Sequence, residues 1–190
     1  MRRLSLLVIT WTIAGAAHAL SVDRIAVSAV AGKSITTWHG QADVQLLNVE
    51  LSKALSPRSD AGFVLAPVSL WQPRSWFGDQ FGDGNETVRA ISGSLLVRRN
   101  FRVDAPTLRW FVEGSTGPMW AEKRVPASTS RFNFISQIGA GVVLRPHTAH
   151  PLTVGYRFIH ISNGGYAPRN PGLNIFTIVA GVEVRSARRR

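Results

Sequence analysis

The chain has 190 residues, carries 22 Lys and Arg against 11 Asp and Glu for a formal net charge of +11, and contains no cysteine. This length fits one domain with a sizeable core. The absence of cysteine excludes disulfides, structural Cys–zinc sites, thiol catalysis and a lipid anchor on an N-terminal cysteine.

The N-terminal segment is typical of a secretory signal peptide. Two arginines precede a mostly apolar stretch from Leu4 to Ala17, and Ala17-His18-Ala19 is a small-x-small cleavage site. We therefore expect residues 1–19 to be removed and residues 20–190 to form a single exported domain. For an exported chain the positive charge suggests anions such as phosphorylated glycolipids and acidic membrane surfaces rather than nucleic acid, and it equally fits a surface whose charge serves solubility alone.

The remainder of the chain is predicted to be all-β. Short segments with period-two alternation are separated by Gly, Pro, Asn, Asp and Ser. In chain order, the predicted strands are Ile25–Gly32, Asp43–Lys53, Gly62–Trp71, Glu86–Arg98, Thr107–Gly117, Arg131–Arg145, Pro151–Ser162 and Leu173–Arg185. The second of these has two mixed faces and fits the pattern least well. Gln72–Asn85 and Pro118–Ser130 are predicted to be long loops.

Each of the last three predicted strands has one apolar face. In Pro151–Ser162 that face carries Leu152, Val154, Tyr156 and Phe158, and the other mixes small, polar and charged residues. Eight such strands fit a soluble sandwich, a lipocalin-like barrel or a transmembrane barrel. Because a membrane barrel needs an apolar outside and a polar or small-residue inside, and because the chain is exported, we predict an eight-stranded antiparallel up-and-down transmembrane β-barrel.

His160 and Ser162 lie at the end of the seventh predicted strand, before a Gly-Gly turn. Residues two apart on a strand share a face, so a histidine base and a serine nucleophile could meet there. Both continue the apolar face, which on a membrane barrel contacts lipid. The alternative is that two ordinary polar residues mark the headgroup level where the strand ends.

The segment from His160 to Asn174, "HISNGGYAPRNPGLN", resembles the active-site segment of the outer-membrane lipid A 3-O-deacylase family, the PagL-like acyloxyacyl hydrolases. The family pattern is His-x-Ser-Asn-small-Gly, a short loop with proline, and Asn-x-Gly before the last strand. Glu113–Pro126 and Arg131–Arg145 also resemble the family's preceding strands. The resemblance implies an outer-membrane barrel that hydrolyses the 3-position ester of lipid A, part of lipopolysaccharide, without metal or cofactor.

Carried over residue by residue, the resemblance implies specific roles. Ser162 is the nucleophile, His160 the general base and Asn174 the residue that orients His160, at a position where the family has an acidic residue. The candidates for an oxyanion hole are Asn163, Asn170 and the backbone amide of Gly165. From the charge of the chain, we further expect Arg157 and Arg169, near the motif, to hold lipid A phosphates.

Two alternatives differ in kind from an enzyme. One is a small outer-membrane barrel that keeps the family scaffold without its catalysis. The other is a soluble periplasmic β-sandwich that binds anionic ligands. The chain also ends in three arginines, Arg188–Arg190, where outer-membrane barrels usually end on an aromatic residue. The oligomeric state stays open.

Overall fold

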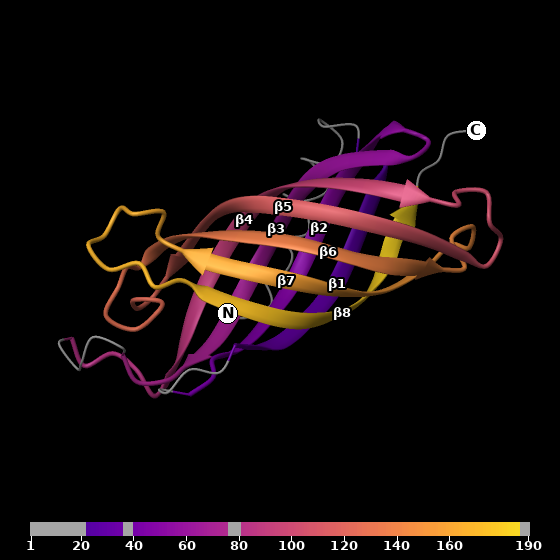
Figure 1. Ribbon diagram of the computed structural model, residues 1–190. Coiled ribbons are helices and arrows are strands. Elements are labelled where there is room, and N and C mark those ends of the chain that lie inside the picture. The colour runs from indigo at the N-terminus through magenta and orange to yellow at the C-terminus, as the bar shows by residue number, and fades with distance from the viewer. Residues whose placement is uncertain (1–21, 36–39, 76–80, 187–190) are drawn as a thin grey trace, which may run out of the picture.

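The fold is one antiparallel sheet closed into an eight-stranded barrel (Figure 1). The computed structural model describes residues 22–35, 40–75 and 81–186, and only the backbone of residues 184–186. The expected signal peptide and Arg188–Arg190 lie outside the described residues. The strands are β1 (Arg24–Ser34), β2 (Asp43–Ser56), β3 (Ser59–Gln72), β4 (Glu86–Phe101), β5 (Leu108–Ala121), β6 (Phe132–Leu144), β7 (Leu152–Ser162) and β8 (Leu173–Ser186).

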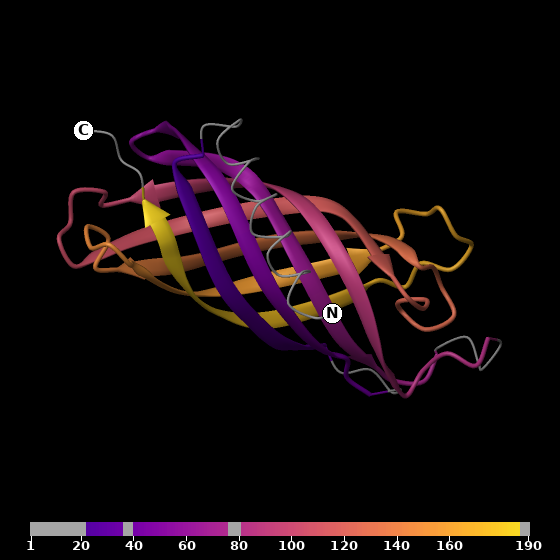
Figure 2. The same ribbon diagram turned by 180° about the vertical axis from the view of Figure 1, so that it is seen from behind.

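Closure comes from the pairing of β1 with β8, so the sheet has no free edge strand. The view from behind shows β1 and β2 completing the wall (Figure 2). This closed topology confirms the predicted barrel and excludes the soluble sandwich. Within the described residues, no helix is long and apolar enough to cross a membrane.

One predicted loop begins too early. Pro118–Ser130 was expected to be a loop, but β5 continues through Pro118 to Ala121. Its pairing with β6 is unbroken there, whereas no residue of β4 pairs with Gly117 or Pro118. A proline lacks the N–H that a ladder needs, and here this break falls on only one side of the strand, so the strand persists.

The outward face of the barrel is apolar, as the alternation of β7 predicts. Tyr156 and Ile178 point outward, and Ile138 is 67% exposed. Trp71 and Trp120 are exposed near one end of the barrel, where β3 and β5 end. Such a band of apolar side chains, with exposed tryptophans near one end, is the surface that a membrane barrel presents to lipid.

The interior of the barrel has two zones, one apolar and one charged. The strand pattern instead predicts an interior of polar or small residues throughout. Near the ends of β7 and β3, buried apolar side chains such as Ile159, Ile161 and Leu70 form a core. Toward the other end the buried residues are charged. This change explains the weak alternation of β2, whose inward face runs from Val44 to Glu50 and so crosses from the apolar zone to the charged one.

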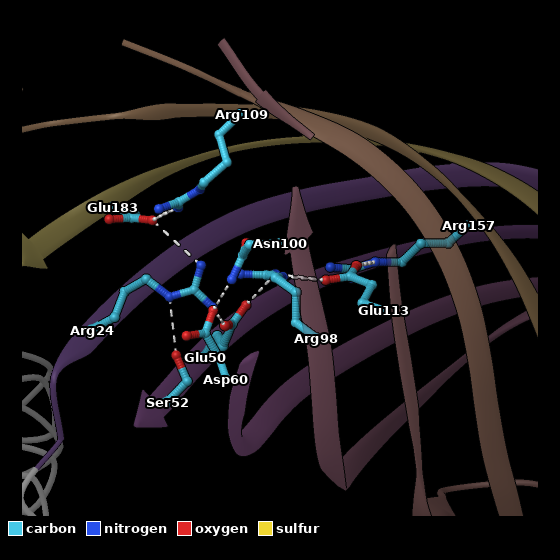
Figure 3. A network of polar contacts seen from close by, with 10 residues as sticks. All are labelled: Arg24, Glu50, Ser52, Asp60, Arg98, Asn100, Arg109, Glu113, Arg157 and Glu183. Atoms are coloured by element: carbon cyan, nitrogen blue, oxygen red, sulfur yellow. Dashed lines mark hydrogen bonds and ion pairs between the residues drawn. The ribbon is translucent and has the colours of Figure 1, made fainter. Parts of the chain in front are cut away.

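The charged zone is a network of ion pairs (Figure 3). Arg98 lies between Glu50 and Glu113, with Nη2 3.0 Å from Glu50 Oε2 and 2.6 Å from Glu113 Oε2. Arg157 Nε donates to Glu113 Oε1 at 2.5 Å. The remaining members are Arg24, Ser52, Asp60, Asn100, Arg109 and Glu183. Buried charges are tolerated because they neutralise one another.

The two ends of the barrel differ in their connections. Short turns, residues 57–58, 102–107 and 145–151, lie at the end where β1 begins. The longest connection, residues 73–85, and the β7–β8 loop, residues 163–172, lie at the opposite end. Outer-membrane barrels have short periplasmic turns and longer extracellular loops, so the end that carries His160 and Ser162 corresponds to the extracellular side.

Candidate active site

The register of β7 and β8 brings His160 and Asn174 together. The two residues are direct partners across the antiparallel pair, on the outward face. His160 Nδ1 lies 2.7 Å from Asn174 Oδ1. Because Asn174 Oδ1 can only accept, Nδ1 carries the proton and Nε2 keeps a free lone pair. The imidazole is therefore held in the tautomer that a general base requires.

Ser162 lies two residues beyond His160 on the same face of β7. Its backbone partner across the sheet is Phe134 of β6. Among the described residues no hydrogen bond joins Ser162 to His160, and the rise of a strand separates the two Cα atoms by roughly 6.6 Å. Both side chains are partly exposed. Such contacts often tighten only when substrate occupies the site.

The loop between β7 and β8 is organised by Asn163. Its side chain is 1% exposed, and its amide group donates to the backbone oxygen of Arg169 at 2.7 Å. Its side-chain oxygen accepts from the Gly165 N–H at 2.9 Å, and its own N–H donates to Asn170 Oδ1 at 3.0 Å. The loop thereby uses the donors of Asn163 and Gly165 that were candidates for an oxyanion hole.

Asn170 differs from these two residues. Its side-chain oxygen is engaged, which orients the amide, whereas its NH₂ group has no acceptor among the described residues. It lies in the same loop as Gly165, where positive φ angles of 64° and 86° at Gly164 and Gly165 form the turn. Of the candidate side chains, Asn170 is the one whose donor is both held and available.

Aromatic side chains that sequence analysis did not connect with the site lie beside Ser162. Phe134 stacks on Tyr166 with a 6.2 Å centroid distance, and Phe132 meets both rings edge-on. Phe132 and Phe134 lie two apart on the apolar face of the predicted strand Arg131–Arg145, but period-two alternation cannot predict that Tyr166, in the loop, folds back onto them. They give Ser162 an apolar wall suited to acyl chains.

The two arginines near the motif have different surroundings. Arg157 is buried in the lumen and bound to Glu113, so the expectation that it contacts lipid A phosphates is wrong. Arg157 and His160 are three residues apart on β7, so their side chains point to opposite faces of the sheet, and that of Arg157 points into the barrel. Arg169 lies in the β7–β8 loop and is partly exposed. In the described part of the chain, no group of three or more His, Asp or Glu side chains could hold a metal ion.

The fold and these residues define a class of protein: a closed barrel of outer-membrane type with serine, histidine and asparagine side chains on its lipid-facing surface. The model of the family "Lipid A 3-O-deacylase (PagL)" matches residues 31–183, and the chain belongs to this family. A comparison with curated proteins found no match.

Two solved structures have the same architecture. The outer membrane enzyme PagL is 19% identical, with a TM-score of 0.56 over 82% of this chain and 97% of that one. Neisserial surface protein A (NspA) is 14% identical, with a TM-score of 0.57 over 85% of this chain and 95% of that one. These similarities establish the fold, which an enzyme and a surface protein share.

Proposed function

We propose that this protein is an outer-membrane esterase that hydrolyses the ester-linked acyl chain at the 3-position of lipid A, with Ser162 as nucleophile and His160 as general base. The observation that carries the proposal is the 2.7 Å contact between His160 and Asn174, on the membrane-facing surface beside Ser162. Membership of the lipid A 3-O-deacylase family supports the choice of substrate.

The position of the site in the barrel suits this substrate. Ser162 is the last residue of β7, at the end with the longest connections. Lipid A occupies the outer leaflet of Gram-negative outer membranes, and its ester bonds lie between sugar headgroup and acyl chains. A nucleophile at the outer end of a lipid-facing strand meets those bonds without extracting the lipid from the membrane.

The chemistry follows a covalent two-step course. Ser162 Oγ attacks the ester carbonyl carbon as its proton passes to His160 Nε2. The carbon–oxygen bond to the sugar breaks, and the proton on His160 moves to the departing sugar oxygen. Water then attacks the acyl-serine while His160 takes a proton from it, and the fatty acid leaves as Ser162 recovers its hydrogen.

The negative oxygen of each tetrahedral intermediate needs hydrogen-bond donors. The Asn170 NH₂ group is our first candidate, and Asn163 and the Gly165 amide are candidates if the loop rearranges around the substrate. Donors of this kind contribute roughly 2.7–4 kcal/mol each. Asn163 thus has a second role, because its bond to Asn170 Oδ1 holds that amide in position.

The test is expression in a host of defined lipid A, followed by mass spectrometry of that lipid. The wild type should remove one ester-linked hydroxyacyl chain, with or without its secondary acyl group. Ser162→Ala and His160→Ala should each abolish the change, because nucleophile and base act as a unit. Ser69→Ala removes an outward-facing serine from β3, on the other side of the barrel, and should stay active.

Heat-dependent mobility in gels verifies that each variant has assembled as a barrel. An unchanged lipid A profile from assembled wild-type protein, across several lipid A types, would refute the esterase and favour a non-enzymatic barrel on the family scaffold. Deacylation by Ser162→Ala would leave the esterase standing with a different nucleophile.

A further inference from the structure

A row of four polar side chains crosses the outward face at the level of His160. Thr116 of β5 pairs with Ser136 of β6, Ser136 pairs with His160 of β7, and His160 pairs with Asn174 of β8. Directly paired residues of an antiparallel sheet point to the same face. At a strand spacing of about 4.8 Å, the row spans roughly 14 Å of membrane-facing surface.

Apolar residues flank this row at both ends and on the side toward the middle of the barrel. Leu95 pairs with Thr116 and is 71% exposed, and the Ile35 N–H binds the Asn174 backbone oxygen at the other end. The next outward residues toward the middle of the barrel are apolar, including Ile138 on β6 and Phe158 on β7. Polar groups that face hydrocarbon are costly and usually have a function. A polar row that lies only at the level of His160 is therefore a candidate part of the site.

Thr116 and Ser136 form a hydroxyl pair. Their oxygens lie 2.8 Å apart, and neither has another hydrogen-bond partner in the part of the chain that the structure describes. Each hydroxyl has one hydrogen, and only one of the two is used between them. The pair therefore keeps one donor for a ligand.

We propose that the Thr116–Ser136 pair is a specificity subsite that binds an oxygen carried by the acyl chain close to its ester. The inference rests on the proposed esterase function. Ser136 is diagonal to Ser162 across β6 and β7, because Ser162 pairs with Phe134, which puts the two residues roughly 7–8 Å apart. An acyl chain running from Ser162 into the membrane passes Ser136 within its first few carbons.

The chemistry of the pair selects among acyl chains. A hydroxyl or acyloxy oxygen on the third carbon accepts the free hydrogen, whereas a plain methylene leaves that donor unpaired in an apolar setting. Sites built to hydrogen-bond a substrate oxygen discriminate well against analogues without it. The apolar residues beyond the row then contact the remaining hydrocarbon, which needs no polar partner.

The experiment uses the purified full chain in phospholipid vesicles with two synthetic glucosamine lipids. They differ only in a 3-O-linked 3-hydroxytetradecanoyl or tetradecanoyl chain. The wild type should favour the hydroxylated ester in kcat/KM by about tenfold, the size of one well-placed hydrogen bond. The double variant Ser136→Ala/Thr116→Val should bring that ratio close to one, because either hydroxyl alone still has a hydrogen to donate, and Ser69→Ala should keep the wild-type ratio.

Each other outcome is decisive. A wild-type ratio of one, or a ratio that survives in the double variant, overturns the subsite while leaving the esterase intact. Loss of activity on both lipids in the correctly assembled double variant would place the pair in the hydrolytic machinery and overturn a role in selection. If the wild type cleaves neither lipid, the proposed function fails and the subsite with it.

Discussion

Asn174 gives His160 orientation without charge. Its side-chain oxygen accepts from His160 Nδ1 at 2.7 Å, which fixes the tautomer as well as a carboxylate would. An amide, however, does not neutralise the imidazolium that forms when the base takes a proton. Asparagine serves in this position in Cys-His-Asn enzymes, so orientation alone can sustain catalysis.

Substitution of Asn174 separates these two contributions. Asn174→Ala should lower the deacylation rate by roughly tenfold to a hundredfold, because the imidazole loses its fixed tautomer. Asn174→Glu should retain or raise the rate, since a carboxylate accepts the same hydrogen bond and adds charge. Rates of lipid A deacylation in vesicles provide the measurement. Full activity of Asn174→Ala would reduce Asn174 to a residue that begins a strand.

Arg169 is our candidate for a phosphate contact. It lies in the β7–β8 loop beside the site, and its backbone oxygen is held by Asn163. Arg169→Ala should weaken activity on bisphosphorylated lipid A by about tenfold and on a dephosphorylated form by much less, because a hydrogen bond between charged groups is lost only in the first case. The exposed Arg58, in a turn at the other end of the barrel, provides the control Arg58→Ala. An equal loss on both substrates would argue against phosphate binding.

At the scale of elements, the β7–β8 loop closes against the catalytic histidine candidate. Gly172 has a φ of 68°, and a Cβ placed there would lie 2.9 Å from His160 Cε1. The loop therefore returns to β8 directly over the imidazole, and a Cβ at this position would have to displace the ring. This close approach gives the Asn-x-Gly part of the motif a physical purpose.

Gly172→Ala should therefore impair catalysis more than folding. The added methyl group must push the imidazole away from its position against Asn174, and we expect a loss of at least about tenfold in kcat. Gly82→Ala is matched in backbone strain, with a φ of 67° and nothing within 4 Å of the added atom, so it isolates the contact with His160. Equal activity of the two variants would contradict a role for Gly172 in placing the ring.

Alternation along the strands predicted the barrel only together with the expected export, because the polarity difference between the two faces of β6, β7 and β8 also fits a soluble sandwich. It also placed His160 and Ser162 outward. Arg157 lies on the opposite face of the same strand, so the alternation already argued against the phosphate contact that we expected of it. It could not pair Thr116 with Ser136, since register between strands depends on contacts that a single strand does not contain. The hydrogen bonds of Asn163 could not be predicted from the sequence either, because the residues of a loop do not alternate between two faces as those of a strand do.

At the scale of the whole molecule, the barrel has a packed interior behind the candidate site on its outward face. The apolar core lies behind the site end, and Ile159 and Ile161 of β7 alternate with His160 and Ser162. The strand that carries the candidate base is therefore anchored from within. The charged network fills the opposite half, and Arg157 ties β7 to Glu113 of β5 there. Both zones hold β7 in place without using any residue that faces lipid.

Stability should therefore depend on the network more than on any ion pair at the surface. Glu113 binds both Arg98 and Arg157, and all three are buried. Glu113→Ala leaves two buried guanidinium groups without this partner, and we expect the free energy of unfolding to fall by about 3–5 kcal/mol. Lys33→Ala breaks an exposed pair with Asp43, whose side chains are 67% and 49% accessible, and should change that free energy by less than about 1 kcal/mol. Urea unfolding of the barrels in vesicles, followed by tryptophan fluorescence, measures both. If Glu113→Ala unfolds at the same urea concentration as the wild type, the apolar core alone stabilises the barrel and the network contributes only to filling its interior.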